Sequence, residues 1–157
     1  AGFGFDTALA WGAGKGNFGG EWPVVWHHDV DTPSSKAFTE AFVAKFGKPP
    51  ENQAWGDYVA TKIVAQAMNE ANSTETAAVL AYFEQEPKLD ILKAREGYFR
   101  AWDHQLMQEM YTMTARPLDE VKDQWDLMVL GPAVPAADQD LQTIAPTPEE
   151  NACKFQA

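Results

Sequence analysis

Apolar side chains repeat at helical spacing in stretches between residues 33 and 84, and they predict three helices. The first is expected to begin at Pro33, with Thr32 as its N-terminal cap, and to end at Gly47. The second is expected over about 53–71. Its apolar stripe consists of Trp55, Val59, Ile63 and Ala67.

A third helix, capped by Ser73 or Thr74, is expected to run to about Glu84. It should bury three side chains, those of Val79, Leu80 and Phe83. A shorter helix is expected to start at Thr7, because Asp6 before it is a good N-terminal cap.

Runs rich in β-branched and aromatic residues predict strands at 21–27, 97–102 and 106–113, and a strand or short buried piece at 124–130. The second and third runs are joined through a polar tip, Asp103–His104. The tail beyond them is rich in proline and is expected to be an extended strap. A strand, three helices and a strand pair in this order indicate the α/β class.

Charge narrows the range of partners. The 157 residues carry 12 Lys and Arg against 23 Asp and Glu, a net charge of −11. A nucleic-acid partner needs a basic face that neutralises phosphates, so nucleic acid is excluded as a partner, and anionic membranes are disfavoured for the same reason. No apolar run approaches the roughly 20 residues that span a bilayer.

The chain begins at Ala1 with neither an initiator Met nor the basic start of a signal peptide. We therefore expect either a removed leader or a start within a larger protein. Cys153 is the single cysteine and cannot form a disulfide within the chain. A free thiol and a bond to another chain both remain open.

Two motifs suggest ligand chemistry and have simpler explanations. Residues 14–19 fit the letters G-x-G-x-x-G, but the segment 20–23 after them cannot open a helix, which favours a flexible loop. Adjacent side chains in an extended segment point to opposite faces, so His27 and His28 are not expected to share a metal with Asp29 or Asp31. The sequence therefore predicts neither a cofactor nor a metal.

Asp103 and His104 would be the acid–base pair of an enzyme, if the protein were one. No Ser or Cys lies in a nucleophile context, and neighbours along a chain rarely orient one another. A polar hairpin tip explains the pair better, and we expect no enzymatic activity.

Trp55 differs from the other five tryptophans because it stands at the start of a helix, after the polar run 51–53. An aromatic wall beside free backbone N–H groups is typical of a ligand-facing position. We therefore take Trp55 as a candidate ligand contact.

A resemblance to a known family rests on several short segments that follow one another in the same order as in that family. They are 36–50, 58–71, 73–83, 97–105 and 144–154. Together they resemble the C-terminal portion of type I periplasmic solute-binding proteins, of the branched-chain amino acid type that serves ABC transporters. The resemblance implies part of a two-lobed α/β fold, with parallel sheets flanked by helices. It places 1–28 in the second lobe, 29–95 in the first, and the hairpin and tail, 96–157, back in the second.

The resemblance also implies a ligand site. Trp55 matches an aromatic position that lines the ligand's side-chain pocket, and Tyr58 lies nearby on the same helix. Phe3 and Phe5 correspond to a loop at the cleft between the lobes, where Ala1 stands in place of an acid that relatives carry.

The implied function is capture of an amino acid or related small carboxylate in the periplasm, or elsewhere outside the cytoplasm, and its delivery to an ABC permease. The remaining N-terminal part of the same protein would be a further partner. Three alternatives stay open: a sensory or regulatory ligand-binding domain of the same fold, an enzyme that uses His104 and Asp103, and assembly with a second polypeptide through Cys153.

Overall fold

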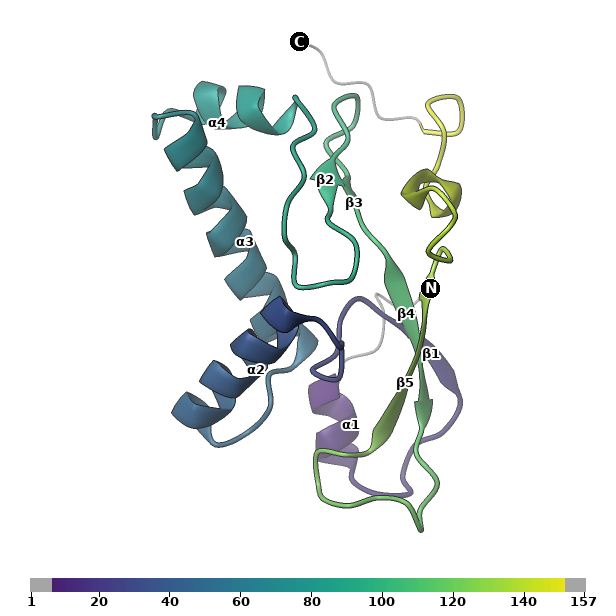
Figure 1. Cartoon of the computed structure of the whole chain (residues 1–157). Helices are drawn as coiled ribbons and strands as arrows, with labels where there is room; N and C mark the ends of the chain where they lie inside the picture. Colours follow the sequence, from purple (N-terminus) through teal and green to yellow (C-terminus); the bar gives the residue numbers. More distant parts are fainter. Residues whose placement is uncertain (1–6, 152–157) are drawn as a thin grey trace.

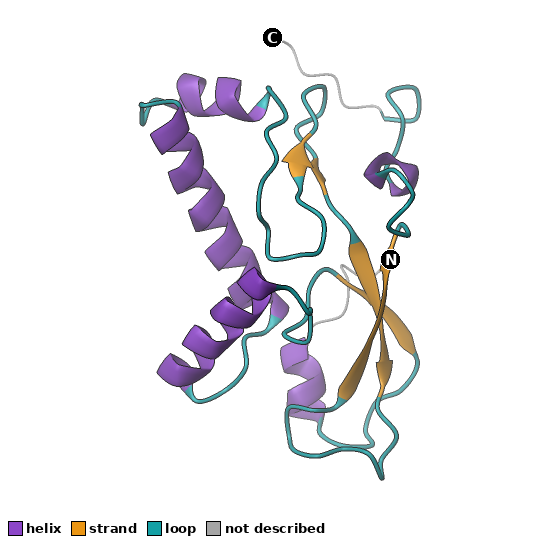
Figure 2. Cartoon of the chain, viewed as in Figure 1, coloured by secondary structure: helices purple, strands orange, loops and turns teal. Residues whose placement is uncertain are grey.

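The computed structural model describes residues 7–151 of the chain. The helices of residues 33–83 gather on one side and a twisted sheet lies on the other (Figures 1 and 2). No helix within these residues is both long and apolar enough to cross a membrane. The elements are α1 (Thr7–Ala13), β1 (Glu21–Val24), α2 (Pro33–Phe46), α3 (Asn52–Glu70), α4 (Thr76–Phe83), β2 (Tyr98–Phe99), β3 (Leu106–Met107), β4 (Met110–Ala115), β5 (Met128–Val134) and the 3₁₀ helix η1 (Leu141–Ile144).

The sheet contains three strands in the order β1-β4-β5, and a separate hairpin pairs β2 with β3. Glu21 lies opposite Thr114 in the first pair of strands, and Met110 lies opposite Val134 in the second. Every strand pair among residues 7–151 is antiparallel, so this part of the fold does not include the parallel pairs that we expected.

The single strand predicted over 106–113 is wrong, because the structure divides it at Gln108–Glu109. Its first half pairs with β2 in the hairpin, whereas its second half lies between β1 and β5. Alternating apolar residues reveal that a segment is extended, but they do not reveal that its two halves have different partners.

The predicted ends of α2 are confirmed. The Thr32 side chain accepts a hydrogen bond from the Ser35 amide at 3.2 Å, and Pro33 occupies the first turn. Gly47 ends the helix with φ of 70°, a left-handed conformation that glycine adopts without steric cost.

Helix α3 buries the predicted stripe of Trp55, Val59, Ile63 and Ala67. The predicted third helix is confirmed as α4, but the burial expected for it is wrong, because none of its residues is buried and Leu80 is 44% exposed. This helix crosses the end of α3 and is covered from one side only (Figure 1). The Phe83 ring contacts the Phe99 ring edge-on at 4.9 Å between centroids, so it is partly covered by the hairpin.

The main core lies between α2, α3, the sheet and the segment 88–97, which runs between α3 and β4 (Figure 1). Trp26, Leu89, Ile91 and Met113 are among its largest fully buried side chains. The segment 88–97 therefore connects the helical side of the molecule to the sheet.

Candidate functional site

Trp55 is part of this core and is only 5% exposed. Its indole is stacked on that of Trp26, with the ring centroids 6.2 Å apart and the planes 8° from parallel. The Trp55 Nε1 donates a hydrogen bond to the Ile91 carbonyl at 2.9 Å, and Trp26 Nε1 donates to the Leu92 carbonyl at 3.2 Å. The segment 88–97 thus covers the aromatic wall that we expected to be open. A role for Trp55 in ligand binding stays a prediction.

A buried lysine lies over the Trp55 ring. The Lys93 ammonium is 4.9 Å from the Trp55 ring centroid and 5.6 Å from that of Tyr111. It donates hydrogen bonds to Gln108 Oε1 at 2.8 Å and to the Glu109 carbonyl at 2.6 Å. Burial lowers the pKa of Lys93 to about 7, and the negative charge of Glu109 opposes this shift.

Glu109 is the centre of a buried polar network and is 1% exposed. Its carboxylate accepts hydrogen bonds from the Ala94 amide at 3.0 Å, from Arg95 Nε at 2.8 Å and from the Tyr111 hydroxyl at 2.7 Å. Burial alone would raise the pKa of Glu109, but the hydrogen bonds from Tyr111 and Arg95 hold it below its ordinary value. Burial and the same carboxylate raise the pKa of Tyr111.

We call Lys93, Arg95, Gln108, Glu109 and Tyr111 the Lys93–Glu109 cluster. None of these five residues was predicted from the sequence to have a functional role. One signal was present, since Glu109 is a carboxylate within an otherwise apolar run predicted to be a strand. Such a residue requires buried partners, because an unpaired buried charge is costly.

We expect the shifted pKa of Lys93 to make stability depend on pH. The folded pKa of about 7 lies below the ordinary value, so between the two values the unfolded chain binds one more proton. The free energy of unfolding should therefore rise with pH above about 7, by up to about 1.4 kcal/mol per unit from this group. Urea unfolding at several pH values between 6 and 10, for the wild type and Lys93→Met, measures this slope.

The matched control for that experiment is Lys45→Met, because Lys45 is an exposed lysine on α2. The Lys45 variant should keep the wild-type slope, and Lys93→Met should lose it. Equal slopes in all three proteins would mean that Lys93 keeps an ordinary pKa in the folded state.

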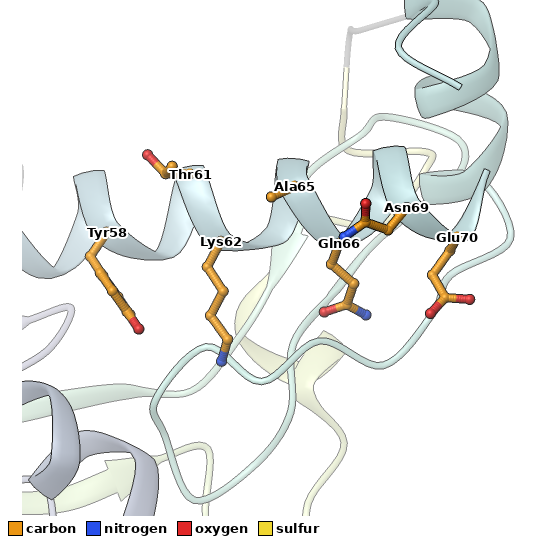
Figure 3. Close-up of a pocket in the computed structure, with 7 residues that line it drawn as sticks. All are labelled: Tyr58, Thr61, Lys62, Ala65, Gln66, Asn69 and Glu70. Carbon is orange, nitrogen blue, oxygen red and sulfur yellow. The ribbon is translucent and has the colours of Figure 1, made fainter. Parts of the chain in front are cut away.

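A shallow groove of about 510 Å³ follows one side of α3 (Figure 3). Tyr58, Lys62, Gln66 and Glu70 point to one side of the helix at four-residue spacing. The other lining residues are Thr61, Ala65 and Asn69.

Tyr58 forms one end of this groove and is 46% exposed. The Phe38 ring holds it in a stacked position, with 4.5 Å between the centroids. Next to Tyr58, Lys62 forms an ion pair with Asp90, with 2.6 Å between Lys62 Nζ and the Asp90 carboxylate. Burial opposes ionisation of Asp90, but the hydrogen bonds from Lys62 and the Leu92 amide lower its pKa overall. Tyr58 therefore offers an accessible aromatic side chain at this end of the groove.

The predicted ligand contacts do not share one surface in the described residues. Trp55 faces the core, whereas Tyr58 is half-exposed in the groove along α3 (Figure 3). Phe38 connects the two regions, because its ring contacts both Trp26 and Tyr58. Phe3, Phe5 and Cys153 lie outside the described residues.

Asp103 and His104 contact different partners at the hairpin tip. The Asp103 carboxylate accepts hydrogen bonds from Arg100, from the Gln105 amide and from Asn151. His104 Nε2 is 3.0 Å from the Glu84 carboxylate on the other side. The geometry is that of a hairpin tip held by ion pairs, as the sequence predicted.

The expectation that His27 and His28 point to opposite faces is wrong. Their rings do not lie on opposite faces but side by side, with 3.9 Å between centroids. Strand β1 ends at Val24, and the two histidines lie in the irregular turn after it rather than in an extended segment. Burial lowers the pKa of His28 to about 4, assisted by His27 and opposed by nearby carboxylates.

Solved structures with the same fold are periplasmic binding proteins. The chain matches one from Burkholderia mallei with a TM-score of 0.80 at 22% identity, over 95% of this chain and 38% of that one. It matches a branched-chain amino acid ABC transporter periplasmic ligand-binding protein from Burkholderia xenovorans with a TM-score of 0.65 at 29% identity, over 73% and 30%. A third match is an amino acid ABC transporter substrate-binding protein from Pseudomonas fluorescens, with a TM-score of 0.65 at 21% identity, over 87% and 35%.

These similarities define the fold as part of a type I periplasmic binding protein, a class of binding proteins rather than enzymes. The periplasmic binding protein family model matches residues 1–121, and the chain belongs to this family. No curated protein matches the sequence. The chain spans 30–38% of the length of the three solved structures.

Proposed function

We propose that the chain belongs to the solute-binding component of an ABC importer, which captures an amino acid or related small carboxylate outside the cytoplasm. The observation that carries this proposal is the match to the periplasmic binding protein family over residues 1–121. Two of the similar structures are named as ligand- or substrate-binding proteins of amino acid transporters, which favours this solute class. The membrane partner would be the importer's permease.

We further propose that the ligand is enclosed between two lobes, one containing 29–95 and the other containing 1–28 and 96–157. The pairing of β1 with β4 supports this division, because it places residues 21–24 and 110–115 in one sheet. Helices α2, α3 and α4 all come from the segment 29–95. Closure would be driven by the higher affinity of the ligand for the closed state.

Tyr58, Trp55, Phe3 and Phe5 are the proposed ligand contacts. Tyr58 has the strongest structural support, because its ring is accessible and is held in place by Phe38. An aromatic face fixed in this way contacts a ligand without losing further side-chain entropy. Trp55 would contribute mainly indirectly. Its ring packs on Trp26, Trp26 contacts Phe38, and Phe38 supports the Tyr58 ring.

Native mass spectrometry of the protein purified from its complete gene, without added ligand, tests the function first. We expect one small solute to co-purify. Calorimetric titration with amino acids and small carboxylates then identifies the class. A protein that carries no solute and binds none of these compounds would contradict the proposal.

The role of Tyr58 is tested with the same calorimetry. Tyr58→Ala should weaken solute binding at least about tenfold, because a well-packed aromatic contact is worth more than 1 kcal/mol. Tyr58→Phe keeps the ring and should bind nearly as well as the wild type. Phe46→Ala is the matched control, because it removes an exposed aromatic side chain at the end of α2. Unchanged affinity in Tyr58→Ala would remove Tyr58 from the site.

A further inference from the structure

We propose that His27, His28 and Asp29 form a binding site for one divalent transition-metal ion, such as Zn²⁺ or Ni²⁺. The site lies in the turn after β1 and is separate from the groove along α3. It does not depend on the proposed solute-binding function.

The ligand atoms already lie close to a coordination geometry. One nitrogen from each histidine and one carboxylate oxygen lie within 4.8 Å of one another. The Asp29 carboxylate is 3.4 Å from His27 Nδ1 and 3.7 Å from His28 Nε2. Ligands about 2.0–2.2 Å from a tetrahedral ion lie roughly 3.3–3.6 Å from one another. The distances from the Asp29 carboxylate to the two nitrogens are therefore close to those between ligands of one tetrahedral ion.

The two imidazoles are held in place by burial. His27 is only 2% exposed and His28 is mostly buried, with the Trp11 ring 6.0 Å from it. Trp11 is itself fixed, because its Nε1 donates a hydrogen bond to the Trp125 carbonyl at 3.0 Å. Asp29 is 45% exposed and forms the opening of the site to solvent. The histidines would supply a rigid half of the coordination shell, and water would complete it from the side of Asp29.

The two histidines are incompletely hydrogen-bonded at the ring nitrogens that would not bind the ion. Within residues 7–151, His27 Nε2 and His28 Nδ1 are buried and have no hydrogen-bond partner. Such buried polar atoms are costly unless the arrangement serves another purpose. His27 Nδ1 accepts a hydrogen bond from the Asp29 amide at 3.2 Å, and metal binding would replace this single contact.

The charges around the site favour a cation. Asp123 and Asp126 both act electrostatically on His28, in addition to Asp29. Arg116 is the basic group nearby, and it is paired with Asp126 at 2.7 Å. Imidazole combined with a carboxylate favours Zn²⁺, Ni²⁺ or Co²⁺, whereas Ca²⁺ and Mg²⁺ prefer oxygen ligands alone.

Calorimetric titration with ZnCl₂ at pH 7.5 tests the site in the chain produced without a polyhistidine tag. All proteins carry Cys153→Ser, so that a thiol contributes no binding. We expect one Zn²⁺ per chain, and no binding of Ca²⁺ at the same concentrations. Co²⁺ should give the visible absorption bands of an ion held by nitrogen and oxygen ligands.

Three further variants in this background make the test specific. His28→Ala and Asp29→Asn should each weaken Zn²⁺ binding at least about tenfold. Asp29 is partly exposed, so its variant keeps the fold even if His28→Ala does not. His104→Ala removes the one histidine outside the proposed site and should bind Zn²⁺ like the parent. Absence of binding, or binding that neither of the first two variants weakens, would overturn the proposal.

Discussion

Replacement of Trp55 with alanine should lower the free energy of unfolding by about 3–5 kcal/mol, the range for loss of a large buried aromatic side chain. The indole is stacked on Trp26 and is almost wholly buried. Alanine would leave a cavity between α3 and the segment 88–97, and it would leave the Ile91 carbonyl without its indole donor. Trp55→Ala should therefore disturb the fold, whatever its effect on ligand binding.

Urea unfolding followed by fluorescence measures this loss. Trp55→Phe keeps most of the packing but lacks the indole N–H, so it should cost less than Trp55→Ala. Trp22→Ala is the matched control, because Trp22 is a partly exposed tryptophan whose Nε1 donates to Gly19 in its own turn. A loss below about 1 kcal/mol for Trp55→Ala would show that the stack does not hold α3 in place.

Replacement of Glu109 with alanine should also cost about 3–5 kcal/mol, because it breaks a buried ion pair from one side. Arg95 would lose the partner of its Nε, and the Ala94 amide and Tyr111 hydroxyl would lose their acceptor. Arg95 would keep its hydrogen bonds to carbonyls in the segment 135–139. The loss should therefore appear in β4 and the segment 88–97 rather than in the attachment of the tail.

The pH dependence of this loss has a definite sign. The folded pKa of Glu109 lies below its ordinary value, so its stabilisation is complete above that value and is lost as pH falls through the folded pKa. The difference in unfolding free energy between the wild type and Glu109→Ala should therefore narrow below about pH 4. Chemical unfolding of both proteins at pH 7 and at pH 3 measures the difference in unfolding free energy at each pH.

Glu84→Ala is the control for Glu109. Its carboxylate is exposed and is paired with His104, so its loss should cost less than about 1 kcal/mol. If Glu109→Ala costs no more than Glu84→Ala, the network around Glu109 does not hold the segment 88–97 against the sheet.

The helices were predictable because their signals are local. Thr32, Pro33 and Gly47 lie within one turn of the ends that they determine, and the stripe from Trp55 to Ala67 lies on one face of α3. The burial expected for Leu80 failed because it depends on what packs against α4, which the sequence of that helix does not contain. The single strand predicted over 106–113 was wrong for the same reason, since the break at Glu109 depends on two different partner strands.

The candidate site was less predictable because it depends on contacts between distant segments. The start of α3 indicated an open aromatic wall, but the carbonyls of Ile91 and Leu92 come from a segment more than 30 residues further along the chain. Lys93 and Glu109 acquire their importance only when burial removes them from water. The stacked histidines required knowledge of the turn geometry after Val24.

The order of strands in the sheet has a consequence for synthesis of the chain on the ribosome. Strand β1 pairs with β4, about 90 residues later, so at roughly 5–20 residues per second it leaves the ribosome several seconds before its partner. During that interval its backbone hydrogen-bonding groups lack the strand that pairs with them in the native sheet. Two residues of β1 reduce the risk of wrong pairing: Glu21 brings a charge, and Pro23 lacks an N–H group. Within residues 7–151 β1 is an edge strand, so the same two residues also discourage pairing with other chains along this edge.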